Sequence, residues 1–173
     1  SLCQAHQHFL QAIILIRKGD LSPAEEALNQ SAVALAKVSG DDLKLATQTL
    51  QALIYNYQGY IRRLRGNYRE AIPYYQRAAA LMRQLGLGGI SGVLTNQAYA
   101  MTMMGYERHG RETAKEALDY AVRNHSVYDQ VRALNVRAIL ETRAGDPEKG
   151  LGFAEEALEL LREYPDHRLE GLV

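Results

Sequence analysis

Small residues recur at fixed distances from four glycines along this chain of 173 residues. These repeat glycines, which lie 47, 39 and 40 residues apart, are Gly19, Gly66, Gly105 and Gly145. The position seven residues before each repeat glycine holds Ala12, Gly59, Ala98 and Ala138 in turn. The positions five and twelve residues after it hold Ala24, Ala71, Gly110 and Gly150, and then Ser31, Ala78, Ala117 and Ala157. A period of this length is typical of helical repeat arrays.

Each repeat is predicted to be a hairpin of two helices. The repeat glycine falls at the end of the first helix, where a left-handed backbone is often required and glycine adopts it most easily. Small residues at fixed positions let the two helices of a hairpin approach closely where they cross. Apolar and polar residues do not alternate with a period of two over any useful length, so we expect no sheet.

Helix-start residues follow the repeat glycines and fix the predicted boundaries. Ser22 and Glu25 form a capping box with Pro23 at the first helical position, and Asp146 caps a helix that opens with Pro147. The predicted helices cover residues 2–17, 22–38, 42–64, 68–85, 90–104, 107–123, 127–143 and 147–163.

The repeat pattern resembles the tetratricopeptide repeat, which places small residues at the same positions of its unit. The second repeat matches best, through Gly59, Gly66, Tyr68, Ala71, Tyr75 and Ala78. The resemblance implies an all-α, right-handed superhelix of four antiparallel helical hairpins. The repeats are longer than the family's usual unit of about 34 residues, and the proline that follows the second helix occurs only as Pro165. Long units of this kind look like those in the sensor arms of bacterial signal-transduction ATPases and transcription regulators, and in kinesin light chains.

We expect one repeat domain over residues 1–173, with repeats at about 2–40, 42–87, 90–125 and 127–165. Residues 166–173 are predicted to begin a further helix, either a cap or a truncated element. The chain begins with serine and ends without a helix-ending signal, so we expect it to be a piece of a longer protein.

Composition narrows the classes of partner. Lys and Arg total 20, as do Asp and Glu, and this balance argues against direct binding to nucleic acid or anionic lipid. No apolar run is long enough to span a membrane, and no signal peptide is recognisable. A single cysteine, Cys3, forms no internal disulfide, which suits a reducing cytoplasm. We therefore expect a cytoplasmic chain without membrane contact.

No motif for catalysis, cofactor binding or metal binding stands out. His6 and His8 are two residues apart on a predicted helix and point to different faces, which makes them a poor metal pair. The glycines from Gly86 to Gly89 follow no strand, so they indicate an inter-repeat turn and not a phosphate loop. Tyr55, Tyr57, Tyr74 and Tyr75 are predicted to fill the seams between helices. We expect no enzyme activity, no cofactor and no metal.

The resemblance implies that the first helix of each hairpin lines a concave groove. Its predicted groove residues are Phe9, Ile13, Arg17, Asn56, Tyr60, Arg63, Thr95, Tyr99, Thr102, Arg132, Asn135, Ile139 and Arg143. Tyr and Arg are favoured interface anchors, amides can pair with a peptide backbone, and guanidinium groups bind carboxylates. We therefore expect a protein-interaction module, a scaffold or sensor arm, that binds a protein or an acidic peptide in this groove.

Three alternatives remain open. The groove residues can form a solvated face or pack against a neighbouring domain of the parent protein. The chain can be the small-molecule-sensing domain of a bacterial transcription or signalling regulator, with Tyr60, Arg63, Tyr99 and Asn135 holding a sugar or nucleotide. The terminal repeats can also associate end to end.

Overall fold

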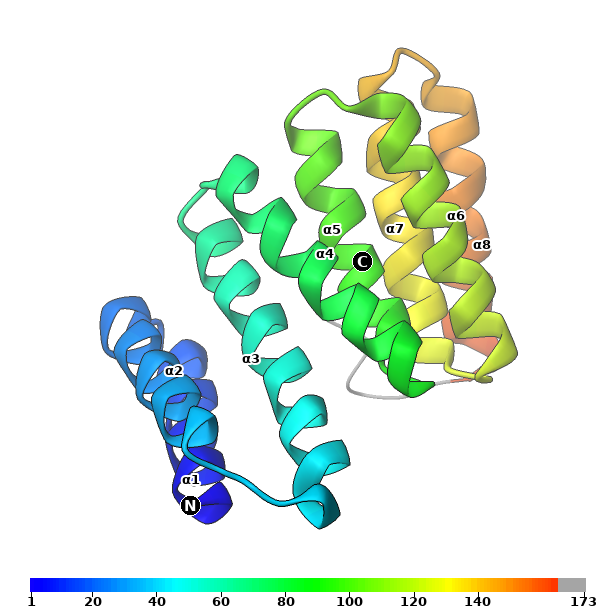
Figure 1. The fold of residues 1–173 in the computed structure, drawn as a ribbon. Coiled ribbons are helices and arrows are strands. Elements are labelled where there is room, and N and C mark those ends of the chain that lie inside the picture. Colours follow the sequence, from blue (N-terminus) through cyan, green and yellow to red (C-terminus); the bar gives the residue numbers. More distant parts are fainter. Residues whose placement is uncertain (165–173) are drawn as a thin grey trace. The chain divides into compact units, whose positions relative to one another are not determined.

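The computed structural model describes residues 1–164, which form eight α-helices, one short 3-10 helix and no strand. Their bounds are α1 (Leu2–Lys18), α2 (Leu21–Ala36), η1 (Asp41–Leu43), α3 (Lys44–Leu64), α4 (Tyr68–Leu85), α5 (Ile90–Met103), α6 (Glu107–Arg123), α7 (Val127–Arg143) and α8 (Pro147–Glu163) (Figure 1). Each predicted helix is present, with ends that differ by at most two residues. Pro165 and the helix predicted at 166–173 lie outside the described residues.

The chain divides into two compact units, Ser1–Leu87 and Gly88–Val173. In the first unit, α1 pairs with α2 and α3 pairs with α4, and α3 also packs against α1 and α2. In the second unit, α5 pairs with α6 and α7 with α8, and α7 also packs against α5 and α6. Each unit thus holds two stacked hairpins, and the first helix of the second hairpin packs against the first hairpin.

The same turn joins the two helices of every hairpin. At Gly66, where φ is 78°, the backbone N–H donates to Arg63 O at 3.0 Å, and the N–H of Asn67 donates to Arg62 O at 2.8 Å. This pair of bonds is the Schellman motif, which satisfies carbonyl groups left open at a helix C-terminus. The corresponding bonds form at the other repeat glycines, whose φ values are also positive: Gly19, Gly105 and Gly145. The prediction of a left-handed glycine at each hairpin turn is confirmed.

The small residues lie where the helices of a hairpin cross. A Cβ atom on Gly150 of α8 would lie 2.9 Å from the carbonyl oxygen of Ala138 in α7, and closer still to Oγ1 of Thr142. A Cβ on Gly59 would lie 2.9 Å from the ring of the fully buried Tyr75. Contacts this short exclude a methyl group, so close helix approach is the reason for small residues at these positions.

A buried carboxylate joins three helices of the second unit. Glu141 of α7 is 3% exposed, and it accepts hydrogen bonds from Arg111 of α6 at 2.9–3.2 Å. Lys149 Nζ of α8 lies 3.2 Å from Glu141 Oε1. The hydrogen bonds from Arg111 lower the pKa of Glu141 below its ordinary value of 4.5, although desolvation opposes them. The same pairing raises the pKa of Arg111.

Gly150→Ala tests the close crossing. The added methyl would clash with α7, so we expect it to destabilise the protein by about 1–3 kcal/mol, the usual cost of overpacking. Gly152→Ala is the matched control on the same helix, because a Cβ there meets no atom within 4 Å. It should stabilise by up to about 1 kcal/mol through helix propensity. Urea unfolding of both variants measures the difference, and equal effects would contradict the crossing argument.

Glu141→Gln tests the buried carboxylate. At pH 7 we expect a loss of about 1–3 kcal/mol of unfolding free energy, since the charge-assisted bonds to Arg111 weaken. A carboxyl whose folded pKa is lowered stabilises fully above its ordinary pKa of 4.5, and this contribution is lost as pH falls through the folded value. The difference in unfolding free energy between native protein and variant, measured by urea unfolding, should therefore be smaller at pH 3 than at pH 7.

Glu112→Gln is the control for that comparison, because Glu112 pairs with Arg108 on an exposed face of α6. Its effect should stay within about 0.5 kcal/mol, as is usual for surface pairs. If the difference in unfolding free energy between native protein and Glu141→Gln stays constant with pH, Glu141 does not contribute through its charge.

Candidate binding surface

Three predicted groove residues lie together on α3 of the first unit. Asn56, Tyr60 and Arg63 are four and three residues apart, which places them on one face of the helix. All three side chains are half-buried. The guanidinium carbon of Arg63 lies 4.8 Å from the centre of the Tyr60 ring, within the range of a cation–π contact. We refer to these residues as the α3 strip.

Aromatic rings tie the α3 strip to the core of the first unit. Phe9 of α1 is buried in the core, and its ring lies edge-to-face on Tyr57 with a centroid distance of 5.4 Å. Tyr57 in turn lies 6.3 Å from Tyr60 at an interplanar angle of 70°. Edge-to-face pairs of this kind hold rings in a fixed orientation. Phe9 therefore supports the strip from the core.

Tyr57 has a role that the sequence did not reveal. It was predicted to fill a helix seam, and it does pack against the core of the first unit. It also connects Phe9 to Tyr60. The spacing of three residues between Tyr57 and Tyr60 was the available signal, because residues three apart are neighbours on a helix.

Asn56 carries a buried acceptor that is unused within the described residues. Its Oδ1 atom is shielded from water and accepts no hydrogen bond there. A buried amide oxygen without a donor costs free energy, and a ligand N–H can remove that cost. The structure thus places one unsatisfied acceptor beside an aromatic ring and a guanidinium group on the same face of α3.

The other two predicted residues of the first unit lie on α1. Ile13 is partly buried and packs against the core cluster of α1, α2 and α3. Arg17 is exposed in the last turn of α1, where a positive charge suits the negative end of the helix dipole. Ile13 therefore serves packing, and Arg17 is the solvent-exposed cation of the pair.

In the second unit, Arg132 of α7 is held by its own neighbours. Its Nη2 donates to Oδ1 of the buried Asn96 on α5 at 3.0 Å, and Nη1 lies 3.9 Å from Asp129 Oδ1. Its guanidinium carbon is 5.5 Å from the Tyr128 ring. Gly92 makes room for this arrangement, since a Cβ there would lie 3.4 Å from Nη1. Arg132 is thus a link between α5 and α7.

The two predicted threonines are also engaged within the fold. Thr95 is buried and donates its hydroxyl to Ser91 O at 2.9 Å, while Thr102 is buried and donates to Ala98 O at 2.8 Å. Thr102 Oγ1 also faces the position of Gly110 on α6. Their hydroxyl hydrogens are therefore used inside the unit.

The remaining predicted residues of the second unit differ in exposure. Tyr99 is half-buried and packs against the small core cluster of Ala98, Ala114 and Val136. Asn135 is half-buried, whereas Ile139 and Arg143 are exposed on the following turns of α7. Among the predicted groove residues of this unit, Ile139 and Arg143 therefore face solvent, whereas Arg132, Thr95 and Thr102 form hydrogen bonds within the unit.

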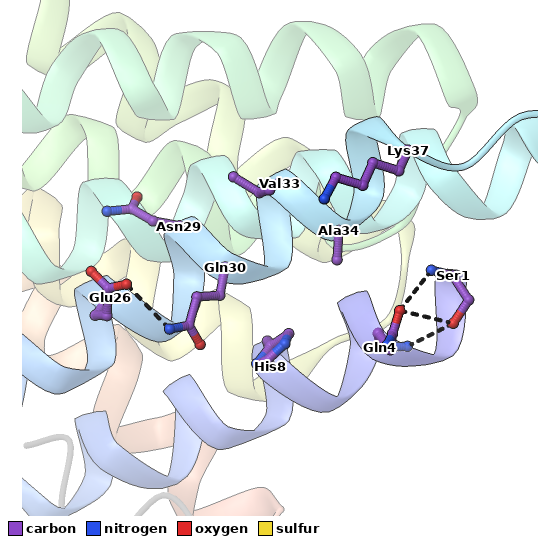
Figure 2. A pocket seen from close by; sticks show the side chains of 9 residues that line it. All are labelled: Ser1, Gln4, His8, Glu26, Asn29, Gln30, Val33, Ala34 and Lys37. Carbon is purple, nitrogen blue, oxygen red and sulfur yellow. Dashed lines mark hydrogen bonds between the residues drawn. The ribbon is translucent and has the colours of Figure 1, made fainter.

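A pocket of about 360 Å³ lies between α1 and α2 (Figure 2). The residues that line it come from both helices and their ends, and they are Ser1, Gln4, His8, Glu26, Asn29, Gln30, Val33, Ala34 and Lys37. Nδ1 of His8 is buried and lacks a hydrogen-bond partner among residues 1–164. None of the predicted groove residues lines this pocket. No sequence motif predicts this pocket, because its walls come from two helices that only packing brings together.

Residues 1–164 contain no group of three or more His, Cys, Asp or Glu side chains that could hold a metal ion. In the same residues, no helix is both long and apolar enough to cross a membrane.

Known structures share this architecture at low sequence identity, although no family model and no curated protein matches the sequence. The crystal structure of Rap protein complexed with Competence and Sporulation Factor matches with a TM-score of 0.74 and 13% identity, over 98% of this chain and 46% of that one. A Podospora anserina protein described as a kinesin light chain with nearly identical TPR-like repeats matches with a TM-score of 0.57 and 12% identity, over 92% of this chain and 95% of that one. The chain has a tetratricopeptide-type repeat fold, as the spacing of its small residues predicted.

Asn56→Leu tests the unused acceptor. Replacing the amide by an apolar group of similar size removes a buried, unsatisfied oxygen, so we expect the variant to gain about 1 kcal/mol of stability. Asn96→Leu is the matched control, because Asn96 is also buried but accepts a hydrogen bond from Arg132. That substitution should destabilise by about 1–3 kcal/mol. Thermal unfolding of both variants gives the comparison, and a clear loss of stability in Asn56→Leu would show that its amide already has a partner.

Proposed function

We propose that this chain is a non-catalytic interaction module that binds a protein or peptide segment, as the scaffold or sensor arm of a larger cytoplasmic regulator. The observation that carries the proposal is the α3 strip, where a buried acceptor on Asn56 lies on the same helix face as Tyr60 and Arg63. A hydrogen-bond acceptor, an aromatic face and a cation are the groups that repeat solenoids offer to extended ligands.

The chemistry of the α3 strip favours an acidic segment or a free C-terminal carboxylate. Oδ1 of Asn56 can accept a backbone N–H from an extended peptide once the half-buried side chain turns its shielded oxygen outward. The guanidinium of Arg63 lies over the Tyr60 ring, which limits its rotamers before binding. Arginine binds carboxylates in a bidentate way, and a cation fixed in advance loses less entropy on binding. Arg17 on α1 is the other cation among the predicted groove residues of this unit.

The comparison with Rap protein supports a binding role for this fold. That protein was crystallised in a complex with Competence and Sporulation Factor, and this chain matches 46% of its length. A repeat fold of this type can therefore present a binding surface. The proposed partner of this chain follows from the chemistry of the α3 strip and not from the partner of Rap protein.

A small-molecule ligand is the second candidate, and the pocket between α1 and α2 favours it. Its volume of about 360 Å³ falls within the usual range for ligand sites. One of its lining residues is His8, whose buried Nδ1 has no hydrogen-bond partner among the described residues. A ligand that binds there raises the melting temperature through its preference for the folded state. His8→Phe, which removes the ring nitrogens, should abolish any such shift.

The test uses fluorescein-labelled decapeptides of acidic, neutral and basic composition, each with a free and an amidated C-terminus. Fluorescence anisotropy should show binding that favours acidic peptides with a free carboxylate. Arg63→Glu should weaken that binding at least tenfold, equivalent to about 1.4 kcal/mol. The control is Arg69→Glu, which changes an exposed arginine on α4 by the same charge and should stay within twofold of the native protein.

Equal affinities of the Arg63→Glu and Arg69→Glu variants would remove the α3 strip as the binding surface. A native protein that binds no peptide of the set would remove the acidic-peptide proposal. A melting shift that a metabolite produces in the native protein and not in His8→Phe would then favour the pocket. Circular dichroism of each variant verifies that its helix content is unchanged.

A further inference from the structure

The outer face of α1 exposes apolar side chains at positions that are buried in later repeats. Ile14 lies five residues before its repeat glycine and is 55% exposed, whereas Ile61 of α3 and Leu140 of α7, at the same position, are at most 1% exposed. Leu10 is 58% exposed, and its counterpart in α7, Val136, is buried. In α3 and α7 these side chains pack against the hairpin that precedes them in the same unit. On α1, no other hairpin of the first unit covers this stacking face.

The outer face of α8 exposes apolar side chains at positions that contact the next hairpin in earlier repeats. Leu151 lies six residues after its repeat glycine and is 59% exposed, and Leu158 on the same face is 36% exposed. The counterparts of Leu151 are Glu25 of α2 and Arg111 of α6, and both contact the first helix of the next hairpin in their unit. Leu118, the counterpart of Leu158 in α6, packs against the core cluster that contains Val131 and Leu134 of α7. On α8 the equivalent face is exposed.

The contacts inside each unit follow one pairing rule between consecutive hairpins. The residue six after one repeat glycine meets the residue four before the next repeat glycine. This rule gives Glu25 with Arg62 at 3.3 Å in the first unit, and Arg111 with Glu141 at 2.9 Å in the second. Applied to α8 and α1, the same rule pairs Leu151 with Leu15, two apolar side chains. Leu15 is half-buried and packs against the core of the first unit.

Two other contacts of the first unit extend the pairing. Arg65 Nη2 donates to Ser22 Oγ at 3.2 Å, and Gln58 Nε2 donates to Asn29 Oδ1 at 3.4 Å. At the corresponding positions of α1 and α8, the first contact becomes Lys18 with Glu148, and the second becomes Gln11 with Glu155. The first pair would join a cation to a carboxylate, and the second would join an amide donor to a carboxylate. Both contacts would be attractive.

The net charges of the two helices are also complementary. α1 contains Arg17 and Lys18 and no acidic residue. α8 contains Glu148, Glu155, Glu156, Glu159 and Glu163 against Lys149 and Arg162. Opposite charge around an apolar centre favours specific association and fixes its orientation.

We propose that α8 of one copy docks on α1 of a second copy, so that the chain associates head to tail. Leu151 and Leu158 cover Leu10, Ile14 and Leu15, and Lys18 pairs with Glu148 at the edge. The interface continues the stacking that joins consecutive hairpins within each unit. Because the two docking faces differ, each copy keeps one face open, and association proceeds beyond a dimer unless it closes into a ring. This surface is separate from the α3 strip, so the proposal is independent of the peptide-binding role.

A mixing experiment tests the two faces separately. Sedimentation velocity should show that the native protein forms species that grow with concentration. Ile14→Glu blocks the α1 face and Leu151→Glu blocks the α8 face, so each variant alone should be a monomer. An equal mixture should form a dimer and nothing larger, because one variant keeps the α8 face and the other keeps the α1 face. The control is Leu45→Glu, which alters an exposed leucine on α3, and it should associate like the native protein.

A charge exchange tests the pairing of Lys18 with Glu148. Lys18→Glu and Glu148→Lys should each weaken association at least threefold, and the double variant should restore it. A native protein that remains monomeric at 100 µM, on the order of the weaker specific complexes, would overturn the proposal. A mixture of the two blocked variants that stays monomeric would also overturn it, because the intact α8 face of one variant would then fail to bind the intact α1 face of the other. Failure of the double variant to recover would overturn the proposed pairing.

Discussion

The structure depends on the close crossing of two helices in each hairpin. At Gly59, Gly110 and Gly150, even an added Cβ atom would lie within 2.9 Å of a neighbouring atom. The glycine turn then sets the direction in which the second helix returns, because its Schellman bonds fix the last turn of the first helix. With the turn and the crossing both fixed, the larger side chains of each helix are directed to the core, the next hairpin or solvent.

The same pair of repeat positions makes the same contact in different repeats with the side chains exchanged between the two helices. At the crossing, Ser31 of α2 donates to Ala5 O of α1 at 2.7 Å, while in the third repeat Ser91 of α5 donates to Ala117 O of α6 at 2.8 Å. The serine has changed helices, but the pair of positions is the same. The contact between consecutive hairpins behaves similarly, since the first unit has the acid before the base and the second unit has the base before the acid. The backbone arrangement is thus conserved between repeats while side-chain identities exchange.

The two units use the polar groups of their predicted groove residues differently. In the second unit, Arg132, Thr95 and Thr102 form bonds within the unit. In the first unit, the α3 strip keeps one buried acceptor without a donor among the described residues. Buried polar atoms are rarely left unsatisfied in native proteins, which is why the proposed binding role is assigned to this helix face. Under that proposal, binding and stability compete at Asn56.

The sequence determined the helices, their boundaries within two residues, and the left-handed glycine of each hairpin, because spacing and backbone geometry are local properties. It also indicated Asn56, Tyr60 and Arg63 as one helix face. Only the tertiary structure showed that Thr95, Thr102 and Arg132 are engaged inside the second unit, and that Tyr57 links Phe9 to the α3 strip. It alone brought together the walls of the pocket around His8. The physical reason is that burial and hydrogen bonding of a side chain depend on residues from other helices. The spacing of residues along the chain does not show how close such side chains come in the folded protein.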